Sequence, residues 1–316
     1  MTNPPAEAVR PGAERGPWRR WGGLAAGLLV LGFLGYALVD GWAAVSEYDW
    51  DVDPGLLALG CLVLLVFYLA SALGYRAVID ELHQPPLPGR VTVSIWARSL
   101  LGRYVPGSVV MILGRVVLSH ERGVPRKATL AGMAYEQLLS VGVAAAGGVA
   151  FIALYGTGDG DGGDARVWLL ALLPLGLLAL HPRVFGPASA WLLRRARREP
   201  LPRLLAGRPL AAVLAWYAGT AVLLGAGIWL TVRAAAGPEA GGPAFVGLAF
   251  LLSFAVSMVA VIFPSGLGIR EGAFALALAQ NVPGGVAVAL SVGSRLVLTL
   301  VELLFVALAV LAGRHR

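Results

Sequence analysis

Long stretches of this chain contain almost no charged residue, and this feature limits the folds open to it. Residues 244–263 are almost wholly apolar and uncharged, and so are residues 273–279. The chain is 58% hydrophobic and 14% charged, with a mean hydropathy of +0.75. Because the apolar residues come in continuous runs, a soluble domain could not bury them all. The sequence therefore predicts an all-α, polytopic membrane helix bundle of about seven to eight spans.

Basic and acidic residues occupy alternate connections between these runs. The 25 Lys and Arg residues gather mainly in residues 1–20, 76–127, 182–208 and 314–316, whereas acidic residues gather near 47–53 and 159–164. This positive-inside pattern predicts a multi-pass plasma membrane protein with both termini cytoplasmic. The net charge of +7 therefore reflects orientation in the membrane, and we expect no nucleic-acid partner.

The apolar runs and the turn residues between them predict the individual helices. We expect residues 1–20 to form a disordered cytoplasmic tail and residues 21–313 to form a single transmembrane domain. Basic residues make 191–198 an expected interfacial amphipathic helix. Spanning helices are expected at 21–44, 56–79, 128–155, 166–180, 210–233, 244–263 and 286–312.

Residues 91–118 interrupt this regular pattern. An amphipathic stretch is followed by an apolar run that is too short to span a bilayer and is broken by Pro106-Gly107. If this run crossed the membrane, the basic residues that follow it, up to Lys127, would lie outside, against the charge rule. The sequence therefore predicts a re-entrant segment that enters and leaves on the cytoplasmic side.

A second interruption covers residues 264–281. Pro264-Ser265-Gly266-Leu267-Gly268 breaks the apolar pattern at membrane depth, and a half-length helix is expected at 270–280. We expect this segment to dip into the membrane and return outward, although a tilted crossing would give the same topology. A broken helix with charges at the break is typical of substrate sites in transporters.

Charged residues within or beside the apolar segments are the candidate site, because such residues are rare in membranes and mark function. The turn before residue 269 is expected to offer free N–H groups to an anion. The expected contacts of a phosphate or headgroup are Arg103, Arg115, Ser265, Gly266, Gly268, Arg270 and Arg295. The expected charge-balancing residues, or ligands of a headgroup cation, are Glu136, Glu271 and Glu302. The alternative is that these charges only lock helices together.

The spacing of two of these residues makes a further prediction. Arg295 and Glu302 are seven residues apart and share one helix face, but they are separated by about 10 Å along the axis. They cannot pair tightly with each other. Each is therefore expected to find its partner on another helix.

Two motifs resemble signatures of a known family. Leu101-Gly102-Arg103-Tyr104-Val105-Pro106-Gly107-Ser108, with Gly114-Arg115 and Glu136, resembles the first signature of the lysylphosphatidylglycerol synthase transmembrane (flippase-like) family. Pro264-Ser265-Gly266-Leu267-Gly268-Ile269-Arg270-Glu271-Gly272 resembles the second, and Arg295 also fits. The resemblance covers about residues 20–312. Gln137 departs from it, because many relatives have Arg at this position.

This resemblance implies a flippase-like lipid transporter. The implied substrate is an anionic phospholipid or a polyprenyl-phosphate-linked intermediate moved between leaflets, and a lipid-modifying enzyme is an implied partner. The synthases proper continue into a soluble aminoacyl-transferase domain. This chain stops at Arg316, so lysyl transfer is not expected and we do not expect an enzyme.

Two other classes of function remain open. A membrane glycosyl- or aminoacyl-transferase would need a catalytic carboxylate, for which Glu136 and the acidic loop Asp49-Trp50-Asp51-Val52-Asp53 are the candidates. We favour a solvated loop that sets orientation. A scaffold for a lipid-modifying partner is the third reading. Cys61 stands alone and the histidines lack metal-ligand spacing, so we expect no metal or cofactor.

Overall fold

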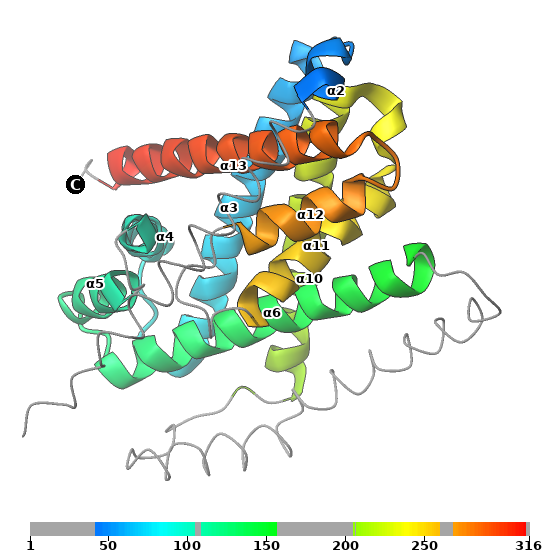
Figure 1. Cartoon of the computed structure of the whole chain (residues 1–316). Coiled ribbons are helices and arrows are strands. Elements are labelled where there is room, and N and C mark those ends of the chain that lie inside the picture. The colour runs from blue at the N-terminus through cyan, green and yellow to red at the C-terminus, as the bar shows by residue number, and fades with distance from the viewer. Residues whose placement is uncertain (1–41, 105–108, 157–204, 206, 260–267, 314–316) are drawn as a thin grey trace, which may run out of the picture.

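The computed structural model describes residues 42–104, 109–156, 205, 207–259 and 268–313 (Figure 1). Within these ranges every regular element is a helix, which confirms the all-α prediction. The predicted tail, the helix expected at 166–180 and the interfacial helix at 191–198 lie outside the described residues, as does most of the first predicted helix.

Four long helices form the frame of the bundle. They are α3 (Pro54–Leu82), α6 (Arg126–Tyr155), α10 (Gly207–Ala236) and α13 (Gly284–Ala312). In the described part of the chain these four are long and apolar enough to cross a membrane. Each contains a predicted helix and extends it by a few residues at one or both ends. At α3 the reason is visible, because the Asp53 side chain accepts hydrogen bonds from Gly55 N and Leu56 N and so caps the helix start.

The first interruption folds as a pair of short helices. α4 (Gly89–Leu100) leads through the 3₁₀ turn η1 (Leu101–Tyr104) toward α5 (Val109–His120), which packs against it. Each helix has 12 residues, or about 18 Å, less than the thickness of a bilayer core. At Gly102 an added Cβ would lie 2.6 Å from Met111 Cα, so only glycine permits this approach of η1 to α5. Whether the pair dips into a membrane stays a prediction.

The second interruption also gives two packed helices. α11 (Pro243–Val259) and α12 (Ile269–Leu278) lie side by side and run in opposite directions. The start of α11 meets the end of α12, where Asn281 Nδ2 donates to the carbonyl of Ala240 at 3.5 Å. The ten residues of α12 cover about 15 Å, so the half-length helix predicted at 270–280 is confirmed. Residues 260–267, which include the predicted break except for Gly268, lie outside the described residues.

The two ends of the bundle differ in charge. At one end the start of α3 meets the end of α10, since Asp53 N donates to Ala234 O at 2.8 Å, and α2 (Trp42–Glu47) lies close by. Burial and the negative charges of Glu239 and Asp49 raise the pKa of Tyr48 here. Figure 1 places α4, α5 and the end of α13 at the opposite end, which carries most of the described basic residues. This separation agrees with the alternation of charge in the sequence.

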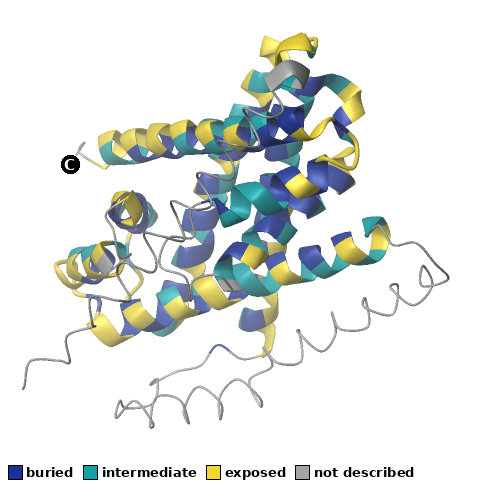
Figure 2. Cartoon of the chain, viewed as in Figure 1, coloured by how far each residue is buried: buried dark blue, intermediate teal, exposed yellow. Residues whose placement is uncertain are grey.

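The core lies where the frame helices cross (Figure 2). Tyr68 of α3 stacks on Phe305 of α13, with ring centroids 5.8 Å apart. Where α10 crosses α11, Gly225 and Gly247 face each other, and a Cβ on Gly225 would lie 3.1 Å from Gly247 Cα. Apolar side chains such as Val222 and Leu300 point outward, as expected of helices that face lipid.

Candidate functional site

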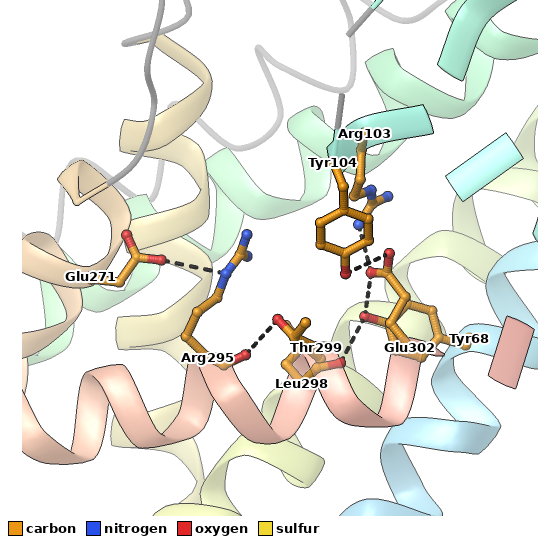
Figure 3. Close-up of polar contacts among 8 residues, drawn as sticks. All are labelled: Tyr68, Arg103, Tyr104, Glu271, Arg295, Leu298, Thr299 and Glu302. Atoms are coloured by element: carbon orange, nitrogen blue, oxygen red, sulfur yellow. Dashed lines mark hydrogen bonds and ion pairs between the residues drawn. The ribbon is translucent and has the colours of Figure 1, made fainter. Parts of the chain in front are cut away.

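A buried carboxylate on α13 is the first element of the site. Glu302 is 3% exposed and accepts three hydrogen bonds from other elements (Figure 3). Tyr68 Oη of α3 lies 2.9 Å from its carboxylate, Arg103 Nη1 of η1 lies 2.8 Å away and Tyr104 Oη lies 3.3 Å away. A carboxylate can remain charged in such a place only because it has a cation and several donors.

Two turns earlier on α13, Arg295 makes the second pair. Its Nε lies 3.6 Å from Glu271 Oε1 of α12 (Figure 3). Ser291 Oγ donates to the Glu271 carbonyl at 2.8 Å. Arg295 and Glu302 therefore pair with other elements and not with each other, as their spacing predicted. Figure 3 shows both pairs on the same side of α13.

Arg270 completes this group, and its nearest described partners are aromatic rings. Its guanidinium carbon lies 4.4 Å from the centre of the Phe250 ring and 5.6 Å from that of Phe254, an arrangement of cation–π contacts. Among the described residues no carboxylate lies within ion-pair distance of it, although the charges of Arg295, Glu271 and Arg103 act on it. We call the five residues Arg103, Arg270, Glu271, Arg295 and Glu302 the central cluster. Three arginines against two glutamates leave it with one excess positive charge.

A second, closed group fixes the short helices α4 and α5 to α6. Arg115 is 2% exposed and forms an ion pair with Glu136. Its Nε donates to Ser99 Oγ at 2.9 Å, and its guanidinium lies over the Tyr75 ring at 4.6 Å. Trp96 Nε1 donates to the other oxygen of Glu136 at 2.7 Å. We call this group the hairpin clamp.

The structure thus divides the charges predicted as one site. Arg103 from the first interruption, Arg270 and Glu271 from the second, and the two α13 residues come together in the central cluster. Arg115 and Glu136 are instead engaged with each other and buried in the hairpin clamp.

The predicted anion cradle before α12 is described only at its last residue. Ser265 and Gly266 lie outside the described residues. Gly268 has φ +91, which favours glycine, and its N–H donates to Glu271 Oε2 at 2.9 Å. The prediction of a free N–H at Gly268 is therefore wrong, because the carboxylate three residues on folds back to cap the helix start.

Sequence reasoning missed the aromatic partners of the site. Tyr68, Phe250 and Phe254 lie inside apolar runs, where an aromatic residue carries no distinguishing signal. Tyr104 stands within the first signature, next to Arg103, and this adjacency could have singled it out. The acidic loop contributes a structural residue, Asp53, which caps α3, and within the described residues no group of side chains could hold a metal ion.

Apolar helices that enclose charge pairs, with two short helix pairs between them, define a polytopic α-helical membrane protein. The sequence model described as the lysylphosphatidylglycerol synthase TM region matches residues 21–305, and the chain belongs to this family. Searches of curated proteins and of solved structures gave no match.

Proposed function

We propose that this protein is a flippase-like transporter that moves an anionic lipid, a phospholipid or a polyprenyl-phosphate-linked intermediate, between the leaflets of the plasma membrane. The observation that carries the proposal is the excess positive charge of the central cluster, with Arg270 unpaired among the described residues. A cationic group inside an apolar bundle is unfavourable unless an anion joins it. A lipid phosphate supplies that anion while its tails stay in the bilayer. Both termini are then cytoplasmic, following the charge alternation.

The exposure of the side chains in the two ion pairs also supports binding of a lipid phosphate by the arginines. In the first pair the Arg103 side chain is 42% exposed and the Glu302 side chain is 4% exposed. In the second pair the Arg295 side chain is 38% exposed and the Glu271 side chain is 12% exposed. An incoming phosphate therefore meets guanidinium groups first and carboxylates last. Guanidinium binds phosphate through two parallel hydrogen bonds, so each arginine can turn from its glutamate to the ligand.

The order of contacts follows from the strength of the existing ones. Arg270 is the first contact, because no ion pair among the described residues has to be broken. Arg295 comes next, since its 3.6 Å pair with Glu271 is long. Arg103, held at 2.8 Å by Glu302, is the last. Arg115 is not a contact in this proposal, because it is buried and already paired with Glu136 in the hairpin clamp.

Leaflet exchange in liposomes tests the proposal. Purified protein is reconstituted into liposomes that contain fluorescent phosphatidylglycerol or phosphatidylcholine, and a quencher that cannot cross the membrane is added outside. The rate at which inner-leaflet probe becomes quenched then measures its movement to the outer leaflet. Arg270→Ala removes the first phosphate contact and should slow exchange of the anionic probe about tenfold or more. Glu271→Gln removes the carboxylate that positions Arg295 and should slow exchange as well. Arg98→Ala, which removes an exposed arginine of α4, is the matched control and should leave the rate unchanged. Undiminished exchange in both site variants would refute the site.

We also propose that this region is not itself a transferase. Among the candidate carboxylates, Asp53 caps α3 and Glu136 forms an ion pair with Arg115, so both have a structural role. A family of synthase membrane regions is consistent with a lipid-modifying enzyme acting beside the transporter. Incubating the purified chain with labelled activated sugar or aminoacyl donors checks this proposal. Label appearing in lipid would show that the chain catalyses transfer.

A further inference from the structure

A groove between α3, α4 and α13 lies away from the central cluster, at the basic end of the bundle. Its volume is about 440 Å³, within the range of about 300–1,000 Å³ that ligand sites usually have. Most of its wall is apolar. The apolar residues come from all three helices and are Leu69, Leu73, Val93, Ala309 and Ala312.

The polar end of the groove is formed where α4 begins beside α3. Arg76 and Arg90 both line it, with Gly89 between them. An added Cβ on Gly89 would collide with the Arg76 guanidinium, so the glycine lets this group lie against the start of α4. Arg76 Nε is 3.3 Å from Asp80 Oδ2, and the Arg76 side chain is still 39% exposed. Two arginines and one aspartate leave this end positively charged.

The start of α4 adds to this positive character. The residue before the helix is Pro88, which has no polar side chain to cap the first N–H groups. The helix dipole then points its positive end toward the groove through Gly89 and Arg90. A phosphate oxygen is the ligand that suits uncapped N–H groups flanked by guanidinium groups.

We infer that this groove binds one anionic phospholipid, with its phosphate at Arg76 and Arg90 and an acyl chain along the apolar wall. Basic pockets between transmembrane helices on the cytoplasmic side bind anionic headgroups, and the positive end here coincides with the basic end of the bundle. Leu69 is 44% exposed, so the apolar wall opens onto the surface that faces lipid. Charge complementarity and this opening select a lipid of the surrounding leaflet over a protein partner.

The bound lipid acts as an anchor for α4. It joins the start of α4 to α3 and to the end of α13, while the other end of α4 carries Trp96 and Ser99 of the hairpin clamp. The two attachments hold α4 at both ends. The site is separate from the central cluster and does not depend on the proposed transport.

Lipid selectivity of the purified full chain provides the test. Protein in detergent is equilibrated with equal amounts of phosphatidylglycerol and phosphatidylcholine, and the lipids retained per chain are counted by native mass spectrometry. The wild-type chain should retain one phosphatidylglycerol that the variant R76Q/R90Q loses, its occupancy falling about tenfold or more. The control R98Q/R122Q removes two exposed arginines outside the groove and should retain it.

Two further variants keep the test decisive. Ala312 is exposed, so Ala312→Phe narrows the groove without disturbing the core and should also reduce retention. Arg270→Ala should leave the groove lipid in place, which separates this site from the central cluster even if transport proves absent. Equal retention of the two lipids by the wild-type chain, or unchanged retention in R76Q/R90Q, would overturn the inference.

Discussion

The hairpin clamp gives the sharpest test of how this bundle is held together. Glu136 accepts from Arg115 and from Trp96, and it is the acid that lets a 2% exposed guanidinium remain charged. Glu136→Ala removes both acceptor oxygens at once. Arg115 then keeps its bond to Ser99 and its contacts with the Tyr75 and Trp96 rings, none of which supplies a negative charge.

The size of the effect follows from these contacts. Removing one partner of a buried ion pair destabilises a protein by about 3–5 kcal/mol. The indole N–H left unpaired adds about 1–3 kcal/mol if no water reaches it. These contributions are not additive, so we expect Glu136→Ala to lower the free energy of unfolding by about 4 kcal/mol.

Replacing both partners should cost much less. Arg115→Met combined with Glu136→Leu fills the same space with apolar atoms, and such exchanges of a buried pair are often neutral or stabilising. Unfolding of the full chain in mixed micelles, followed by circular dichroism at increasing denaturant, measures the wild type, Glu136→Ala, the single variants Arg115→Met and Glu136→Leu, and the double variant. The double-mutant cycle should give a coupling of about 2 kcal/mol or more.

Two outcomes would refute this reasoning. A loss below about 1 kcal/mol in Glu136→Ala would mean that Arg115 is not buried as a charge. A double variant as unstable as the sum of the single variants would mean that the two side chains are not coupled. Leaflet exchange should persist in the double variant, since the clamp has no phosphate contact in the proposed mechanism.

Two other predictions concern helix packing. Tyr68→Phe removes one donor to Glu302, whose bond to Arg103 remains. It should therefore lower the free energy of unfolding by about 1 kcal/mol in the same denaturant assay. A loss above about 3 kcal/mol would contradict the view that Arg103 is the main partner of Glu302. Gly225→Leu should sharply reduce the yield of monodisperse protein in size-exclusion chromatography, because a Cβ there would lie 3.1 Å from Gly247 Cα. Gly219→Leu is the control and should leave the yield unchanged, because nothing lies within 4 Å of a Cβ at that position.

The positions of the long helices could be predicted because length and hydropathy are local properties. A run such as residues 286–312 is recognisable in any arrangement of the bundle, and α13 begins only two residues earlier. The half-length helix α12 was equally recognisable, since Pro and Gly precede it and Asn281 follows its end. Helix ends were less accurate, because caps such as Asp53 act over single residues.

The partners of the charges could not be predicted in the same way. Arg103 and Glu302 are 199 residues apart, and nothing local in the sequence links them. Arg103 and Arg115 are close in sequence and flank the same short apolar run, yet one lies on η1 and pairs with α13 while the other lies on α5 and pairs with α6. The spacing of Arg295 and Glu302 correctly excluded an ion pair between them, because their separation along the axis depends only on helix geometry.

The two charges on α13 have a mechanical consequence. One helix carries the cation of one ion pair and the anion of the other, and their partners sit on separate helix pairs. A displacement of α13 by one turn, about 5.4 Å, would break both pairs in the same movement. Movement of α13 along its axis would therefore act on the α11–α12 pair and on the α4–α5 pair together, because it would release Glu271 from Arg295 and Arg103 from Glu302 at the same time.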